Sequence, residues 1–511
     1  MSLKYDAGTA ARDSSKIWTL AATILGSSLT FIDATVVNVA LPALQADLHA
    51  TITDVQWVIE AYALLLGGLI LVGGSLGDQF GRKRTFLAGV VVFALASIAC
   101  GVATTTRALI VARAVQGAGA AFLVPGSLAI ISATFSDAER GRAIGAWSGW
   151  SAMTSAIGPV AGGWLIEHVS WRAIFFVNVP LSLLVIALSL RFISESRDTS
   201  RANRVDWMGA GLAVLGLGGI VFGLLEAPTR NDANRPLAMA AMAIGTVAIV
   251  AFIGVERRVA SPMLPLGLFR SRTFTLANLL TFLLYAALGV LLWLLPLNLI
   301  QVQHYTATNA GAALLPVPVL MFLLSRWSGG LVARVGRRLP LTIGPAFAAA
   351  GLALFATPGI GESYWTTFFP AVTILGVGMA IVVAPLTTTA MSAVETKHSG
   401  VASGVNNAVA RVAGLVAIAV FGILLVRAFD ARVSPALDRI ALAPDARAAV
   451  ERELPKLAGA ETGEVVDAQQ RNEVRRAIEE SFVSAFRLAM LGAAALALAA
   501  ALAGSRISAD H

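Results

Sequence analysis

The chain has 511 residues, of which 57% are hydrophobic and 13% are charged, whereas a typical soluble domain carries about 25% charged residues. A water-soluble chain of this length could not bury so much apolar surface. The composition therefore argues against a soluble enzyme or a disordered chain and indicates an integral membrane protein. The single cysteine, Cys100, cannot form an intramolecular disulfide, and the five histidines are scattered without metal-ligand spacing.

A helix needs about 20 mainly apolar residues to cross the hydrocarbon core of a bilayer. Fourteen segments meet this requirement, so we expect an all-α membrane protein with about fourteen transmembrane helices. The first span is expected to be retained, because no signal-peptide cleavage site follows it. In chain order the spans cover residues 17–38, 55–76, 85–104, 108–132, 143–166, 172–192, 205–226, 237–255, 275–300, 309–332, 340–357, 366–390, 403–427 and 484–504.

The net charge of +8 is explained by where the basic residues lie. Lysine and arginine cluster in alternate connections, as at 82–84, 257–258 and 334–338, and such clusters face the cytoplasm. We therefore expect both termini to be cytoplasmic and nucleic acid not to be a partner. The long connection 428–483 then lies outside the cell, where we expect a solvated cap with an amphipathic helix over 465–482.

The sequence contains an internal repeat. Gly74, Leu76, Gly81, Arg82 and Lys83 match Gly329, Leu331, Gly336, Arg337 and Arg338 at a constant offset of 255 residues. Parallel repeats of this kind are typical of one transporter architecture. We expect a six-helix bundle over 1–200, two inserted helices over 201–262, and a second six-helix bundle over 263–511 that includes the loop 428–483.

Four motifs occur in order along the first half of the chain. They are the stretches Asp33 to Pro42 in the first span, Gly74 to Arg84 after the second, Leu109 to Ala121 in the fourth, and Gly158 to Gly163 in the fifth. With them the chain resembles the major facilitator superfamily, and within it the fourteen-helix drug:proton antiporters. The resemblance covers nearly the whole chain and implies a multidrug efflux transporter, an antiporter in the bacterial cytoplasmic (inner) membrane.

Two of these motifs predict moving parts. Gly74 and Gly81 permit a tight turn and close helix contact, and Asp78 and Arg82 are placed to hold the cytoplasmic side shut. The alternative is a basic loop that only satisfies topology. The fifth span is interrupted and narrowed by Gly158, Pro159, Gly162 and Gly163. This segment is either a pivot or a static close helix crossing. By resemblance, the motif accompanies export.

Ionisable side chains in the hydrocarbon are costly and are candidates for function. Asp33, Glu60 and Arg113 lie within spans. We expect Asp33 to accept a proton, with Arg113 setting its affinity, and Glu60 to be a second proton site or the counter-charge for a cationic substrate. The alternative is that Asp33 or Glu60 only pairs with Arg113 across helices.

A further set of aromatic and polar side chains lies deep in the spans and could line a substrate cavity: Tyr62, Trp150, Tyr285, Trp293, Arg326, Asn406, Asn407 and Arg411. Aromatic rings suit lipophilic cations. Because Arg326 and Arg411 are positively charged, a substrate with a negative group stays an alternative. The amides of Asn406 and Asn407 are suited equally to binding substrate and to joining helices.

The sequence thus predicts a proton-coupled secondary transporter that exports lipophilic, often cationic, drugs by alternating access. An exporter of an amphiphilic lipid or an anionic metabolite is the alternative. We expect no enzyme activity, no metal and no cofactor, with the proton gradient as the energy source. The expected partners are a small-molecule substrate, protons and the lipid bilayer, and the expected functional unit is a monomer.

Overall fold

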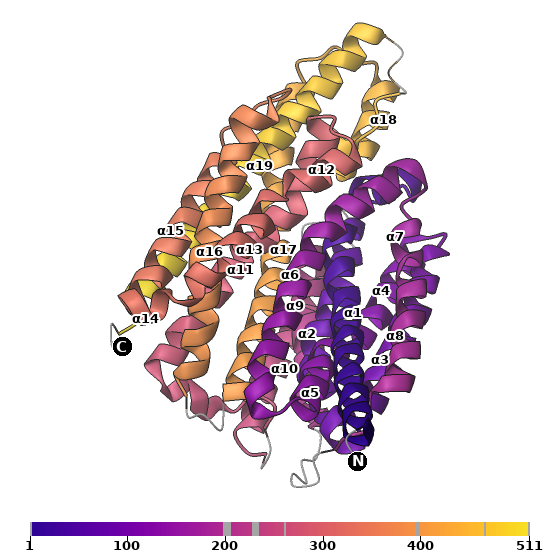
Figure 1. Cartoon of the computed structure of the whole chain (residues 1–511). Helices are drawn as coiled ribbons and strands as arrows, with labels where there is room; N and C mark the ends of the chain where they lie inside the picture. The colour runs from indigo at the N-terminus through magenta and orange to yellow at the C-terminus, as the bar shows by residue number, and fades with distance from the viewer. Residues whose placement is uncertain are drawn as a thin grey trace.

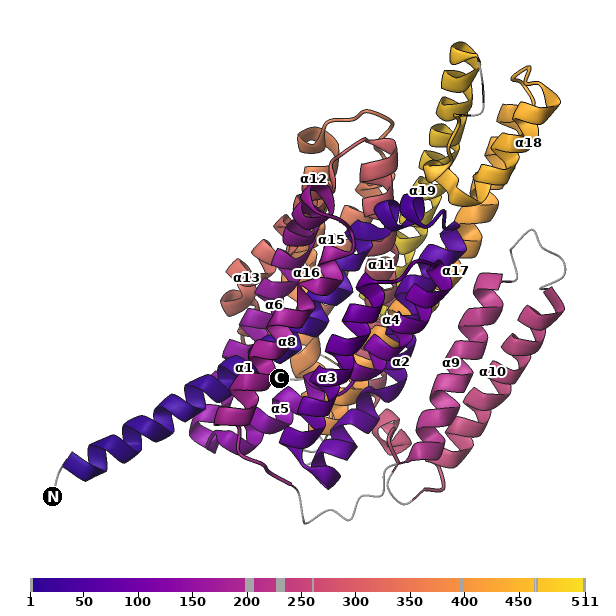
Figure 2. The same cartoon turned by 90° about the vertical axis from the view of Figure 1, so that its right-hand side faces the viewer.

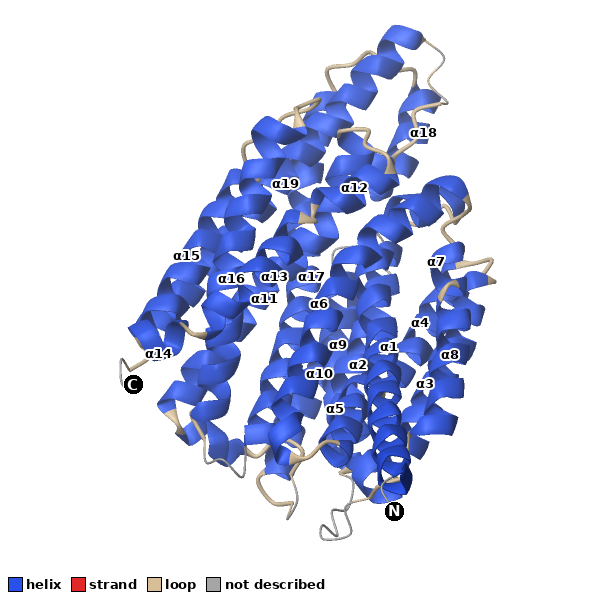
Figure 3. Cartoon of the chain, viewed as in Figure 1, coloured by secondary structure: helices blue, strands red, loops and turns tan. Residues whose placement is uncertain are grey.

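A computed structural model describes residues 3–197, 206–226, 235–259, 262–394, 399–463, 465 and 467–508. Throughout these residues the regular structure is helical and no strand occurs (Figure 3). The N-terminus and the C-terminus both lie away from α18 (Figure 1). We call the end that carries α18 the cap end, and the end that carries Arg82 to Arg84 the basic end.

The first bundle contains α1 to α8, and polar residues define several of its helix starts. Thr51 accepts a hydrogen bond from the amide of Asp54, whose carboxylate bonds back to Thr51, and Thr105 caps α4 in a similar way. The helices are α1 (Leu3–Asp47), α2 (Ile52–Phe80), α3 (Arg82–Gly101), α4 (Thr106–Ala120), α5 (Leu123–Thr134), α6 (Asp137–His168), α7 (Ala173–Phe176) and α8 (Asn178–Phe192).

Two inserted helices, α9 (Trp207–Glu226) and α10 (Arg235–Glu256), form a pair at the side of the molecule (Figure 2). α9 packs against α2 and α17 (Ser399–Leu437), and α10 packs against α9. The indole of Trp57 in α2 donates a hydrogen bond of 3.2 Å to Glu226 at the end of α9, which attaches the inserted pair to the first bundle.

The second bundle contains the remaining helices, several of them interrupted by proline. Pro296 lies inside α11, and Pro345 inside α15. The elements are η2 (Leu266–Arg270), α11 (Arg272–Leu297), η3 (Asn298–Val302), α12 (Ala307–Ala313), α13 (Pro316–Gly329), α14 (Leu331–Val335), α15 (Arg338–Leu354), η4 (Tyr364–Phe368), α16 (Phe369–Ser392), α17, α18 (Pro444–Glu453), η6 (Leu454–Gly459) and α19 (Ala468–Ser505).

Each of the fourteen expected spans coincides with one helix or with two consecutive helices, except 309–332, which overlaps α12, α13 and the start of α14. Within the described residues, twelve segments are long and apolar enough to cross a membrane. α15 has 17 residues and is shorter, and the glycine-rich and serine-rich α6 is not among the twelve. The structure therefore gives an all-helical membrane protein, while apolar length alone supports twelve spans rather than fourteen.

The two copies of the internal repeat adopt related backbones. Gly81 (φ +113°) separates α2 from α3, and Gly336 (φ +72°) separates α14 from α15. Positive φ is accessible to glycine without the steric penalty that other residues meet. The glycine at each turn is therefore required by the backbone, 255 positions apart.

The connection 428–483 is not a solvated loop. α17 continues to Leu437 and α19 already begins at Ala468. Phe429, Val450 and Phe482 from this region are fully or almost fully buried, in the same apolar core as the bundle helices. Gln45 of α1 donates a hydrogen bond to the carbonyl of Lys456, so the cap is folded onto both halves rather than being a spacer.

The two halves are joined at the cap end. One apolar core there combines side chains of both halves, such as Leu41 and Leu291. Toward the basic end, a core around Phe86 in the first half is separate from a core around Phe274 in the second. Gln56 of α2 also donates a hydrogen bond of 3.1 Å to the carbonyl of Ile418 in α17. The structure is therefore closed at the cap end.

Candidate functional site

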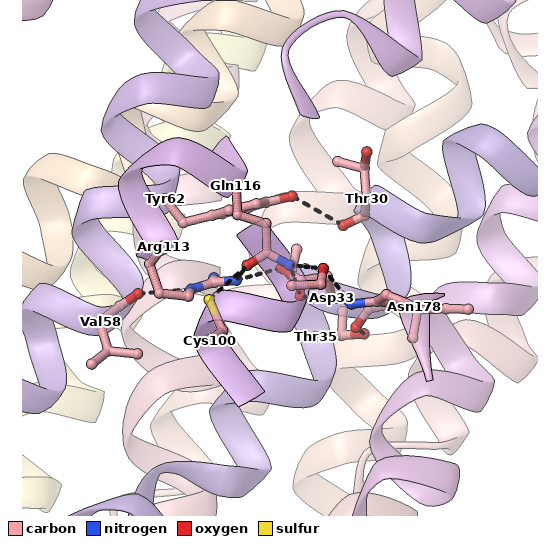
Figure 4. A network of polar contacts seen from close by, with 12 residues as sticks. Thr30, Asp33, Thr35, Val58, Tyr62, Cys100, Arg113, Gln116 and Asn178 are labelled. Carbon is pink, nitrogen blue, oxygen red and sulfur yellow. Dashed lines mark hydrogen bonds and ion pairs between the residues drawn. The ribbon is translucent and has the colours of Figure 1, made fainter. Parts of the chain in front are cut away.

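A buried polar network lies inside the first bundle (Figure 4). The Arg113 side chain of α4 donates to the Oδ2 atom of Asp33 in α1 at 2.5 Å, to Oε1 of Gln116 at 2.6 Å and to the carbonyl of Val58 in α2 at 3.1 Å. Asp33 and Gln116 are 0% exposed and Arg113 is 1% exposed. Charges desolvated to this degree persist only with close partners.

The second oxygen of the Asp33 carboxylate is also satisfied. Its Oδ1 atom accepts hydrogen bonds from Gln116 (2.9 Å) and from Asn178 of α8 (3.4 Å), and Gln116 also donates to Ser97 of α3 at 2.8 Å. The network therefore ties together α1, α2, α3, α4 and α8. Both carboxylate oxygens of Asp33 accept hydrogen bonds in it.

An aromatic face completes the network. The guanidinium carbon of Arg113 lies 4.2 Å from the ring centroid of Tyr62 and 5.9 Å from that of Phe175, within the range of cation–π attraction. The Tyr62 hydroxyl donates to the carbonyl of Thr30 at 3.4 Å. Tyr62, expected in a substrate cavity, thus covers the buried arginine.

Glu60 differs from Asp33 in having no hydrogen-bond or ion-pair partner among the described residues. Its side chain is 0% exposed, and both carboxylate oxygens are buried without a hydrogen bond among the described residues. It lies on α2, between Gln56, which bonds to α17, and Gly67, which faces the Cβ of Arg411 in α17. Of the two pairings considered from the sequence, the structure contains Asp33 with Arg113 and not Glu60 with Arg113.

A cavity of about 180 Å³ lies between the halves. Thr35, Asn38 and Ser155 are its polar side chains, and each donates to a carbonyl of its own helix. The remainder of the lining is Val39, Ala156, Pro159, Leu288, Leu291, Leu292, Pro296, Gly311, Leu314, Leu315, Val317, Pro318 and Leu375. No charged side chain of the described residues is part of this lining.

Of the aromatic and polar residues predicted for the cavity, those whose side chains the structure describes do not line it in this conformation. Asn406 joins α17 to α11 by donating to Asn278 (3.2 Å) and Thr281 (2.7 Å), and Asn407 donates to the carbonyl of Ser403. The bonds of Asn406 are the helix-joining alternative, whereas the bond of Asn407 stays within α17. Helix packing, rather than a lack of suitable chemistry, keeps these amides out of the cavity.

The other predicted residues are dispersed. Trp293 is fully buried with its indole nitrogen unbonded, and Trp150 is 54% exposed on α6. Arg411 lies within electrostatic range of Tyr62 and Tyr285 and makes no ion pair among the described residues. Arg326 belongs to α13, but its side chain lies outside the described part.

The expected gate motif is tied into the first bundle. Arg82 donates to Asp78 at 2.8 and 3.0 Å and to the carbonyl of Ala129 in α5 at 3.4 Å. Glu195 accepts the amides of Lys83 and Arg84 and lies where a Cβ on Gly81 would stand. These bonds lie within one half, so in the present conformation the motif organises the basic end of that half.

The glycines of α6 make close contacts at the cap end. Gly158 and Gly162 face α1, where a Cβ on either would meet Thr35 or Val36. Gly163 faces the backbone of Ala307 in α12, and Gly311 of α12 faces the carbonyl of Pro159. The motif therefore supplies the closest crossing between the halves.

Outside the spans, the clearest electrostatic feature is Glu139 near the start of α6. Lys16 donates to both of its oxygens at 3.0 and 2.8 Å, and Ser136 donates as well. The hydrogen bond from Lys16, with those from Ser136, lowers the pKa of Glu139 to about 2.

Several polar residues of the network were not predicted as site residues. Gln116 lies within a recognised motif but was given no role, and Ser97 and Asn178 were not considered. The only signal for them is a polar residue inside an apolar span, which many helix-joining residues share. Asp206 and Glu256, a buried carboxyl pair beside Gly209, were also missed, because one lies at the very start of an expected span and the other directly after the end of the next.

Two packed helical halves joined across an internal cavity, with buried charges inside the spans, define a multi-pass membrane transporter of small molecules rather than an enzyme. Residues 23–418 match the sequence model of the Major Facilitator Superfamily. The chain belongs to this superfamily.

The relatives of the chain include resistance and export proteins. It is 34% identical to multidrug resistance protein Stp of Mycobacterium tuberculosis over 96% of this chain and 92% of that protein. It is 32% identical to the tetracenomycin C resistance and export protein of Streptomyces glaucescens over 94% and 90%. A solved bacterial homologue of the human lysosomal transporter Spinster, 17% identical, shares the fold with a TM-score of 0.63 over 96% of this chain and 97% of that one.

Proposed function

We propose that this chain exports lipophilic drugs from a bacterial cell in exchange for protons, by alternating access between its two halves. The similarity to a multidrug resistance protein and to a tetracenomycin C resistance and export protein supports export. The lining of the central cavity supports a lipophilic substrate, because aliphatic and proline side chains form most of it. The protein acts as a monomer in the cytoplasmic membrane with both termini inside the cell. This conformation then faces inward.

The observation that supports proton coupling is the burial of the Glu60 carboxyl without a partner among the described residues. Leaving an ionised carboxylate buried without a partner costs several kcal/mol, so we propose that Glu60 holds its proton here. It lies on α2 where α2 meets α17, so a change in the packing of the halves would admit water or a cation to it. A carboxyl that gains and loses its proton as the halves move would couple proton entry to substrate export.

Asp33 and Arg113 have a complementary role in this proposal. Their ion pair stabilises the first bundle while the cap end is closed, and opening that end gives Asp33 access to external protons. Arg411, with no acidic partner among the described residues, favours the alternative of an anionic metabolite or lipid as substrate. The uncharged lining of the cavity favours the drug.

The test uses the purified protein in vesicles with an imposed pH gradient, with ethidium and puromycin as probes. The native protein should accumulate probe against its gradient, release protons as it does so and lose both activities on addition of a protonophore. Glu60→Gln and Asp33→Asn should fold, retain downhill probe movement and lose uphill transport. Uphill transport at the native rate by Glu60→Gln would refute the coupling role of this residue.

A further inference from the structure

A groove of about 1120 Å³ lies at the cap end, away from the central cavity. One wall is α19, a second is the end of α17, and the third is the segment around Gly359. The groove is lined by Gly359, Ile360, Ala428, Ala431, Arg432, Asn472, Arg475, Arg476, Glu479, Glu480, Val483, Ser484, Arg487, Leu488 and Leu491. Nothing in the export proposal uses it.

The third wall is fixed in place by side chains. Gln303 donates to the carbonyl of Gly359 at 2.7 Å, and its own oxygen accepts the amides of Gly361 and Glu362. Arg487 donates to the carbonyl of Pro358 at 3.0 and 3.3 Å. The groove is thus bounded by helices and an anchored segment.

Two arginines of the groove are available to a ligand. Arg476 is paired with Glu480 at 2.8 Å, and Glu479 lies 3.6 Å from His304. Arg475 lies within electrostatic range of Glu479, but neither it nor Arg432 forms an ion pair or side-chain hydrogen bond within the described part of the chain. Both are exposed. A guanidinium with free donors is suited to bidentate binding of a phosphate.

The groove becomes more apolar away from Arg475, apart from Arg487, whose guanidinium is bonded to the carbonyl of Pro358. On α19, Arg475 is followed by Val483 and then by Leu488 and Leu491, which are 44% and 51% exposed. On α17, Ala428 precedes Arg432 in the outward direction. The apolar segment 484–504 belongs in the hydrocarbon, so Leu488 and Leu491 lie within it and Arg475 lies on its cap side.

We propose that this groove binds an anionic phospholipid from the leaflet at the cap end. Its phosphate lies between Arg432 and Arg475, and an acyl chain follows Leu488 and Leu491. The lipid would rest against the outer parts of α17 and α19, which meet along their length, and would stabilise the cap that closes this end. This inference is independent of the exported substrate.

The experiment measures lipid binding to the full-length protein in detergent by native mass spectrometry. Phosphatidylglycerol and phosphatidylcholine with the same acyl chains are compared, and glycerol phosphate supplies the headgroup without a chain. The native protein should retain one phosphatidylglycerol in preference to phosphatidylcholine. Arg432→Gln/Arg475→Gln should bind it about tenfold more weakly, which corresponds to about 1.4 kcal/mol. Arg439→Gln, an exposed cap arginine outside the groove, is the matched control and should bind normally.

A second variant tests the apolar part without changing charge. Leu488→Gln should weaken binding of the lipid and leave any binding of glycerol phosphate unchanged. Equal binding of the two lipids, or an unchanged affinity in both the arginine double variant and Leu488→Gln, would overturn the proposal. Binding of glycerol phosphate as strongly as the lipid would indicate a simple anion site and would also overturn it. Ethidium transport by the double variant, measured separately, keeps this outcome distinct from that of the export proposal.

Discussion

Gly163 of α6 lies against the backbone of Ala307 in α12, and no side chain separates the two helices at this point. A Cβ at Gly163 would require the helices to move apart, since the opposing atoms are backbone. The same holds at Gly311, which faces the carbonyl of Pro159. The closed cap end therefore depends on glycine at both positions.

Gly163→Ala and Gly311→Ala are expected to destabilise the cap-closed conformation. Overpacking of this kind typically costs about 1–3 kcal/mol, enough to change a conformational equilibrium about tenfold. Spin labels at exposed positions 169 and 309 should report a longer mean distance in either variant than in the native protein. Gly145→Ala, on the same helix with open space around its Cβ position, should leave the distance unchanged, and an unchanged distance in Gly163→Ala would contradict this interpretation.

The pairing of Asp33 with Arg113 predicts strong non-additivity. Removing one charge leaves the other buried and unpaired, which costs about 3–5 kcal/mol, whereas removing both leaves no such charge. Asp33→Asn and Arg113→Gln should each lower the apparent Tm. The decrease in the double variant should be smaller than the sum of the two single decreases. Thermal unfolding of all four proteins in one detergent measures this. Simple additivity would mean that the two charges do not interact energetically.

Glu139 provides a test of where pH acts. Its pKa is lowered to about 2, below the ordinary value near 4.3. The pair with Lys16 therefore stabilises the folded chain fully above pH 4.3, and the contribution is lost as pH falls toward 2. Glu139→Gln should leave the pH profile of transport between pH 5 and 8 unchanged. Glu60→Gln should alter that profile, and a shift of equal size in both variants would exclude Glu60 as the specific titrating group.

Asn406 is expected to act in packing rather than in substrate choice. Its bonds to Asn278 and Thr281 cross from α17 to α11, and interhelical bonds in membranes contribute about 0.6 kcal/mol on average. Asn406→Ala should lower the apparent Tm slightly and change the transport rates of ethidium and puromycin by the same factor. Asn407→Ala, whose side chain bonds only within α17 among the described residues, is the control. A changed ratio of the two rates in Asn406→Ala would place it at the substrate.

Periodicity and composition predict the helices well, because each span must satisfy its backbone internally in lipid. The pairing of Asp33 with Arg113 was among the sequence expectations, since few ionisable residues are available inside the spans. The isolation of Glu60 could not be predicted, because it depends on which face of α2 meets α17. The burial of Tyr62 and the helix-joining role of Asn406 depend on helix rotation in the same way. In the cap, the helix expected over 465–482 corresponds to the start of α19, whereas α18 and the burial of the cap against the bundles were missed because the charged composition resembles a solvated loop.

Gly81 and Gly336 place a glycine turn at corresponding positions of the two halves, but the residues next to these glycines differ. Asp78 sits beside the first glycine and clasps Arg82, whereas position 333 beside the second is alanine. The basic end is therefore asymmetric, because both halves have the glycine turn and only the first has the Asp78–Arg82 pair. The contacts that close the basic end should therefore start from the Asp78–Arg82 pair of the first half and reach the second half. Duplication placed a glycine turn in both halves, and later divergence left the acidic partner beside only one of them.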